Sequence, residues 1–124
     1  MKDNEILVEH SYDPDADALF ISKVADYEYD ESVELTNDVY LDFDMNGEAS
    51  AVEVLNASKV FNVSKFSLKN IGPISMKIGV NEKLICLELS IGVLVHNKEL
   101  LKSLNHSAVN DINAPIMNTE LATA

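Results

Sequence analysis

Residues 38–54 of the chain read DVYLDFDMNGEASAVEV. Apolar residues alternate with polar ones on both sides of Asn46 and Gly47, which is typical of two strands joined by a tight turn. Asn-Gly is the preferred pair for a two-residue type I′ turn, in which both residues have a positive φ. Such a turn aligns three residue pairs on the apolar face: Phe43 with Ser50, Leu41 with Val52 and Val39 with Val54.

Charge separates the two faces of this hairpin. The second face carries Asp38, Tyr40, Asp42, Asp44 and Glu53. A slip in register by one residue would bury these carboxylates, so the register is well specified. A second hairpin is predicted over residues 74–95, where a turn at Asn81 and Glu82 would place Ile78 opposite Ile85.

The remaining chain is predicted from the same periodicities. Alternation indicates strands at residues 6–12, 18–24 and 32–35, and an apolar stripe indicates a helix over residues 58–68 with Ser58 as its N-cap. Asn97 would cap a second short helix, and periodicity ends near Asn105. The chain is therefore predicted to be α+β, an antiparallel β-meander of hairpins with one or two short helices packed on one face. Residues 1–105 would form a single domain and residues 106–124 a flexible C-terminal tail.

The charge of the chain is negative and unevenly distributed. The 124 residues include 21 acidic residues, nine lysines and no arginine, for a net charge of −12. Residues 1–60 hold sixteen acids and three lysines, whereas residues 61–124 hold five acids and six lysines. Nucleic acid and anionic membrane surfaces attract cationic proteins, so neither is an expected partner. The single cysteine, Cys86, and the absence of a secretory signal pattern at the start predict a cytoplasmic protein.

Two stretches resemble a known family. Residues 12–21 read YDPDADALFI and are similar to its opening YDPxADxLYI hairpin, and residues 38–58 are similar to its second signature. The family is catalogued as domain of unknown function 2283, and the resemblance covers about residues 6–60. Ala51 is a departure, because the family often has glycine at that position. The resemblance implies a small β-rich cytoplasmic fold without an established activity, and an antitoxin-like role beside a small toxin.

The hairpin also matches a metal-binding pattern. Its candidate ligands fit the spacing of the EF-hand calcium loop, D-x-[DN]-x-[DN]-G-x5-E: Asp42, Asp44, Asn46 and Glu53. That loop needs a helix on each side, whereas the flanks here alternate as strands do, so calcium binding stays the alternative hypothesis. No catalytic constellation and no cofactor site are expected, because His10, His96 and His106 have no Cys or His at ligand spacing.

The favoured hypothesis is a non-enzymatic protein-interaction module that presents its acidic half to a basic protein. The proposed interaction residues are Tyr12, Asp13, Asp17, Tyr40 and Leu94. A homo-oligomer is also predicted, with its interface on residues 74–95. That segment is apolar at nearly every position from Leu84 to Val95, which a sheet covered on one side would leave exposed to water.

Overall fold

A computed structural model describes residues 5–124. In this part of the chain the elements are β1 (Glu5–Asp13), β2 (Ala18–Lys23), β3 (Tyr29–Thr36), β4 (Val39–Asp44), β5 (Ala49–Val54), α1 (Ala57–Phe61), α2 (Lys65–Lys69), β6 (Ile74–Val80), β7 (Leu84–Val95), β8 (Lys98–Val109) and β9 (Met117–Ala122). The strands form a single nine-stranded sheet in the order β3-β4-β5-β2-β1-β9-β6-β7-β8. The chain therefore combines a large sheet with two short helices, and the α+β prediction is confirmed at that level.

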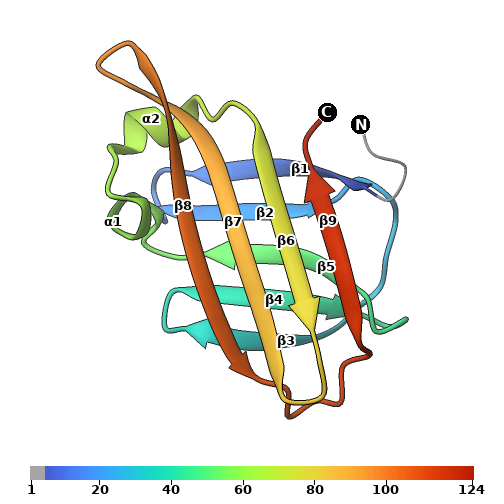
Figure 1. The fold of residues 1–124 in the computed structure, drawn as a ribbon. Helices are drawn as coiled ribbons and strands as arrows, with labels where there is room; N and C mark the ends of the chain where they lie inside the picture. Colours follow the sequence, from blue (N-terminus) through green and yellow to red (C-terminus); the bar gives the residue numbers. More distant parts are fainter. Residues whose placement is uncertain (1–4) are drawn as a thin grey trace.

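The sheet folds over on itself to form two layers. In Figure 1, β1–β5 cross behind β6–β9 at a steep angle. Strand β1 belongs to both layers, because Glu5–Leu7 pair in parallel with β9 and Val8–Asp13 pair antiparallel with β2. This parallel pair makes the sheet mixed, and the antiparallel pairing of β2 with β5 brings together strands that are not consecutive. The predicted antiparallel meander of hairpins is therefore not what the sheet forms.

The first hairpin has the predicted register over most of its length. Leu41 pairs with Val52, but a bulge after Asp42 pairs Phe43 with Ala49 in place of Ser50. Gly47 has a φ of 76° while Asn46 does not have a positive φ, so the predicted type I′ turn is wrong. Residues 45–47 form a three-residue loop, in which a turn is followed by a left-handed glycine. The cause is a side chain: the Asp44 carboxylate accepts hydrogen bonds from the backbone N–H groups of Asn46 and Glu48.

The second hairpin is shifted by two residues from its predicted register. Ile78 pairs with Leu87 in place of Ile85. The loop is longer than predicted because Oδ1 of Asn81 accepts hydrogen bonds from the backbone N–H groups of Lys83 and Leu84, both at 2.8 Å. A shift of two leaves every side chain on its predicted face, since successive strand residues alternate between faces.

The predicted C-terminal helix and tail are both replaced by strands. His96 and Asn97 have φ values of 50° and 63°, which is the backbone of a two-residue hairpin turn and not of a helix cap. Strand β8 follows this turn and extends to Val109, beyond the predicted domain boundary at residue 105. Further along, β9 lies between β1 and β6 and is hydrogen-bonded to both. Residues 106–124 thus contribute the end of one strand and a second, central strand, with Leu121 buried.

The predicted helical stretch is divided in two. Asn62 has a φ of 55° and separates α1 from α2. Asn56 is the N-cap of α1 in place of the predicted Ser58, and Ser64 caps α2 by accepting a hydrogen bond from the backbone N–H of Ser67 at 3.1 Å. Among residues 5–124, neither helix has the length and apolar content needed to cross a membrane.

The core lies between the two layers and is shared by them. Its fully buried side chains come from the inner faces of both: Leu19, Ile21, Leu41 and Phe43 from β2 and β4, and Ile74, Ile78, Ile85, Leu87, Leu89 and Ile91 from β6 and β7. Phe61 and Leu68 of the two helices pack against the same core. Because the inner faces are used in this way, the outer face of each layer is left for contacts with solvent or with partners.

Candidate functional site

The outer face of β2–β5 brings together the polar side chains of the N-terminal half. We call it the acidic outer face; alternation and strand register assign to it Phe20, Ser22, Ser32, Glu34, Tyr40, Asp42 and Glu53, and Tyr27 of the loop before β3 lies against it. The inner residues of the same strands are the apolar ones of the core. The predicted division of charge between faces is therefore present for Tyr40, Asp42 and Glu53, whereas Asp44 is buried in an ion pair with Lys23.

A pair of carboxyl groups occupies the middle of this face. The side chain of Asp42 is buried, with 4% of the residue exposed, and its Oδ1 accepts a hydrogen bond of 2.5 Å from the Ser32 hydroxyl. Glu53, on the neighbouring strand, is hydrogen-bonded to Asp42. Burial, this hydrogen bond and the charge of Asp42 raise the pKa of Glu53 to about 7. Near pH 7 Glu53 is therefore protonated in about half of the molecules.

The loop between β2 and β3 covers the pair from one side. The Tyr27 side chain is hydrogen-bonded to Ser22, and burial together with the negative charge of Asp42 raises the pKa of the phenol. The loop is anchored by a hydrogen bond of 2.8 Å from the Met45 N–H to the carbonyl oxygen of Glu28. Tyr27 thus lies close enough to the carboxyl pair for the charge of Asp42 to favour its neutral form.

A buried ion pair lies next to the carboxyl pair. Lys23 Nζ donates hydrogen bonds to Asp44 Oδ2 at 2.8 Å and to Glu48 Oε2 at 3.4 Å. Burial alone would lower the pKa of Lys23, but its hydrogen bonds with the two carboxylates outweigh burial and raise it. Burial would likewise raise the pKa of Asp44, but the hydrogen bond from Lys23 outweighs burial, so the pKa of Asp44 is lowered. Both groups are therefore charged at neutral pH, and the pair fixes the 45–47 loop against β2.

Sequence reasoning did not single out Lys23. The signal was its spacing, because Leu19, Ile21 and Lys23 follow one another at the period of a strand, and the first two are core residues. A lysine at the third position of such a series is directed to the buried side and requires a carboxylate partner. Tyr27, Ser22 and Ser32 carried no comparable signal, since the loop and the β3 register determine their positions.

A second polar cluster, which we call the Asp17 clasp, joins the two stretches that resemble the family. Asp17, at a φ of 52°, accepts hydrogen bonds from the Tyr12 hydroxyl at 2.6 Å, from the Ser58 hydroxyl at 2.6 Å and from the Ser58 N–H at 3.0 Å. Its carbonyl oxygen accepts from the Ala57 N–H at 2.9 Å. Burial would raise the pKa of Asp17, but the bonds from Ser58 and Tyr12 outweigh it and lower it. The clasp thus ties the start of α1 to the β1–β2 turn.

The four residues of the calcium hypothesis do not converge on one point. Asp42 and Glu53 form the carboxyl pair, whereas Asp44 is bonded to Lys23 and to the backbone N–H of Asn46. Across the described residues 5–124, no group of three or more His, Cys, Asp or Glu side chains is arranged to hold a metal ion. The match to the EF-hand pattern is accounted for by the hairpin and its Asp44-stabilised loop.

The five predicted interaction residues are found in three environments. Tyr12 and Asp17 form the Asp17 clasp, and Asp13 accepts hydrogen bonds from the backbone of the same turn. Tyr40 lies on the acidic outer face, where its hydroxyl donates to Glu34 at 3.2 Å. Leu94 is exposed at the end of β7, in the other layer. The structure therefore brings together only the first three, and it uses them within the chain; their role toward a partner stays a prediction.

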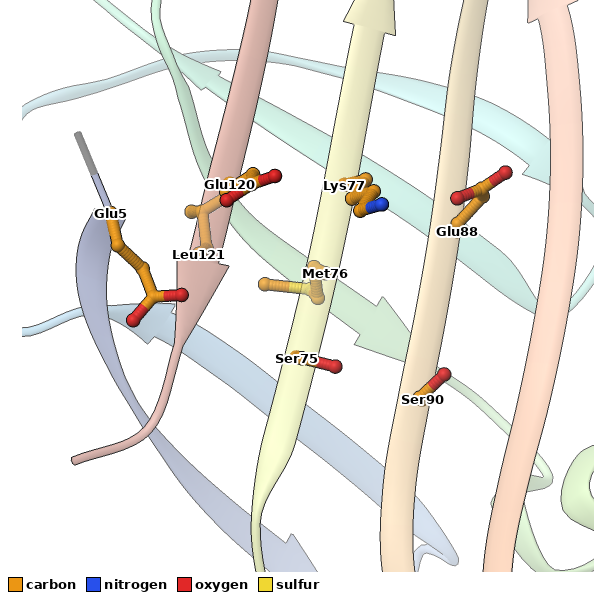
Figure 2. A pocket seen from close by; sticks show the side chains of 8 residues that line it. All are labelled: Glu5, Ser75, Met76, Lys77, Glu88, Ser90, Glu120 and Leu121. Carbon is orange, nitrogen blue, oxygen red and sulfur yellow. The ribbon is translucent and has the colours of Figure 1, made fainter. Parts of the chain in front are cut away.

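The outer face of the second layer has a cavity of about 310 Å³ over β9, β6 and β7. Figure 2 shows Lys77 between the carboxylates of Glu120 and Glu88, which lie on the two neighbouring strands. The strand registers place both carboxylates opposite Lys77. Glu5 of β1 adds a third carboxylate to the lining. The cavity is thus polar and predominantly acidic.

Comparison with known proteins relates these features to a family. The profile described as "Protein of unknown function (DUF2283)" matches residues 10–58, which include the Asp17 clasp and the carboxyl pair. A protein of Methanosarcina mazei named "Putative hypoxanthine phosphoribosyltransferase" is 31% identical in an alignment that covers 94% of this chain and 93% of the Methanosarcina protein. An uncharacterized protein of Methanocaldococcus jannaschii is 36% identical over 61% of this chain and 66% of its own. No solved structure matches the chain significantly. The chain belongs to the DUF2283 family of proteins of unknown function.

Proposed function

We propose that the chain is a non-enzymatic protein-interaction module whose acidic outer face binds a basic protein. The observation that supports this most is the distribution of charge over the two layers. The first 60 residues hold sixteen of the 21 acidic residues, and their strands share one outer face. A face of one sign attracts a partner of the opposite sign and orients it during the encounter. An antitoxin-like pairing with a small basic protein is the specific form of this proposal.

The side chains of this face suit a protein partner. Glu34 and Asp30 on β3 are exposed, and Tyr29 and Tyr40 lie beside them. Tyrosine provides a rigid contact surface with few rotamers to immobilise, which is why it is enriched at interfaces. Lys23 is engaged with buried Asp44 and with Glu48, so it does not neutralise Asp30 or Glu34. The face therefore keeps its negative charge available to a cationic surface.

The proposal can be tested with a lysine-rich model peptide, whose binding is followed by fluorescence anisotropy at low and at high salt. The test variant combines Asp30→Asn and Glu34→Gln, which remove two exposed charges from β3, the edge strand beside the acidic outer face. The matched control combines Glu88→Gln and Glu99→Gln, which remove two exposed charges from the other layer. Each lost contact is expected to cost about 0.5–1 kcal/mol, so the test variant should bind roughly 5–30-fold more weakly.

Two results would contradict the proposal. One is equal weakening by the test variant and the control, because the peptide would then respond to net charge and not to this face. The other is binding that does not weaken between about 0.1 M and 0.5 M salt, since screening shortens the reach of surface charges over that range. Capture of a natural partner should show the same salt dependence and the same difference between the two variants.

The name of the Methanosarcina relative refers to a phosphoribosyl transfer. Proteins hold phosphate groups with cationic side chains or with backbone N–H groups at helix starts. The cavity over β6 sets three carboxylates around one lysine, and the acidic outer face is negative as well. Both surfaces favour cations over phosphorylated substrates, so the geometry gives no support for extending that activity to this chain.

A further inference from the structure

Strand β8 is a long edge strand of the sheet, and parts of it lie near β3 and α1 of the same chain. It pairs with β7 along its whole length, from Lys98 opposite Val95 to Val109 opposite Leu84. It stands last in the strand order of residues 5–124, so its other side has no hydrogen-bonded strand. Figure 1 shows it along one margin of the front layer. The N–H and C=O groups along such an edge can pair with a strand of another molecule.

Exposed apolar side chains follow this edge. On β8 they are Leu100, Leu101 and Val109, and on the adjacent strand β7 they are Leu84 and Leu94. Leu101 is the most exposed of them, at 73%. The second half of the strand, residues 103–109, contains no Asp, Glu, Lys or Arg. The opposite edge of the sheet differs, because β3 carries Asp30, Glu31 and Glu34, and charged residues discourage pairing at an edge.

We propose that β8 pairs with β8 of a second copy of this chain, antiparallel and about a two-fold axis, so that the sheets of two protomers become continuous. In such a pair, two residues that stand opposite each other must point to the same side of the joined sheet. This holds when the numbers of the two residues add up to an even number. A register centred on Leu104 pairs Leu100 with Ala108 and Lys102 with His106 of the second copy. No two carboxylates and no two lysines stand opposite each other in this register.

Charge and area both favour a second copy as the occupant. The half of the chain that contains β8 holds five acids and six lysines, whereas the excess negative charge lies in the other layer. The five exposed aliphatic side chains provide on the order of 500 Å² of apolar surface, and the backbone of β8 adds to it. A standard interface buries roughly 800 Å² per partner, so strand pairing along β8 must add to this area, and we expect a dimer that dissociates on dilution. The proposal is independent of the acidic outer face and its partner.

The test is sedimentation velocity over a range of concentrations, with circular dichroism to check the fold. The variant Leu101→Glu places a charge in the proposed interface. Its control is Ile116→Glu, because Ile116 lies outside any strand and is equally exposed, at 72% against 73% for Leu101. We expect the wild type and the control to dimerise. The dissociation constant of the Leu101→Glu dimer should be at least tenfold higher than that of the wild type. If Leu101→Glu loses its fold, Leu101→Ser serves in its place.

Amide hydrogen exchange identifies the edge itself. Residues 99–109 should exchange more slowly as the protein concentration of the wild type rises, and this dependence should vanish in Leu101→Glu. Salt distinguishes this contact from the binding of a basic partner, since added salt should leave the dimer unchanged or strengthen it. A wild type that stays monomeric, a dimer insensitive to Leu101→Glu, or exchange at 99–109 that is independent of concentration would each overturn the proposal.

Discussion

The two layers of the sheet are held in different ways. In the layer formed by β1–β5, polar contacts connect residues far apart in the chain: the Asp17 clasp, the Lys23–Asp44 pair and the Asp42–Glu53 pair. In the layer formed by β6–β9, the buried positions of β6 and β7 are aliphatic or methionine throughout. The turns of this layer are stabilised locally, as by Asn81. One layer is thus rich in specific polar contacts and the other in apolar burial.

The difference indicates that the two layers contribute differently to the stability and to the specificity of the fold. Apolar burial contributes most of the free energy of folding, but it distinguishes poorly between registers that differ by two residues, because both bury the same face. Buried polar groups add little net stability, and they impose a geometry because leaving any of them unpaired is costly. The family profile covers residues 10–58, where the polar contacts are. The stretch that the family profile matches therefore contains a set of side chains whose partners fix where they lie.

The largest expected effect comes from the apolar layer. Leu89 of β7 has no exposed surface and packs between the two layers, so Leu89→Ala should lower the free energy of unfolding by about 3–5 kcal/mol. All four tyrosines lie in the first layer, so tyrosine fluorescence reports on that layer while far-ultraviolet circular dichroism reports on both. Because the core is shared, the two signals should change together in urea.

Ile116→Ala is the control for this experiment, since Ile116 is exposed and the change should stay within about 0.5 kcal/mol. If the two signals separate, with fluorescence unchanged at the dichroism midpoint, the layers would fold independently. The two layers would then be separate folding units and would not share one core.

The sequence allowed the local half of this arrangement to be predicted. Alternation and Asn46-Gly47 correctly placed the hairpin around residues 39–54 and separated its apolar and acidic faces. The Asp17 clasp was not predicted, because 41 positions separate Asp17 from Ser58 and no periodicity links them. Strand β9 was missed for a related reason: it is made by pairing on both sides with β1 and β6, and its own sequence, MNTELA, has little apolar alternation. The positions of Asp17, Ser58 and β9 are therefore set by pairing between distant parts of the chain and not by a local sequence pattern.

The polar layer should respond to the loss of the Asp17 clasp. Asp17→Ala removes the acceptor for Tyr12 and for the hydroxyl and N–H of Ser58, and keeps only the backbone bond from Ala57. We expect a loss of about 2–3 kcal/mol, as for buried hydrogen bonds to a charged group. Asp15→Ala is the control, since Asp15 is exposed in the same turn and should change stability by less than about 0.5 kcal/mol. Equal effects of the two variants in urea unfolding would show that the clasp contributes nothing beyond the turn.

The smallest effect, and the most specific to the polar layer, concerns the carboxyl pair and pH. The pKa of Glu53 is about 7 in the folded protein against an ordinary value of 4.5, so the folded state retains a proton that the unfolded state releases. The contribution of Glu53 to stability is therefore complete below about pH 4.5 and is lost as the pH rises to about 7. We expect a decline of about 1–3 kcal/mol over that window, followed by a plateau.

Glu53→Gln should remove this decline. The amide can still donate a hydrogen bond to Asp42 but cannot ionise, so the free energy of unfolding should stay level between about pH 4.5 and 7. The opposite dependence belongs to Asp17 and Asp44, whose pKa values are lowered from 3.8, and their contributions are lost only as the pH falls below that value. The two windows do not overlap, so urea unfolding at several pH values separates them. A wild type that becomes more stable from pH 4.5 to 7, or a Gln variant with the same decline, would show that Glu53 does not retain its proton in the folded state.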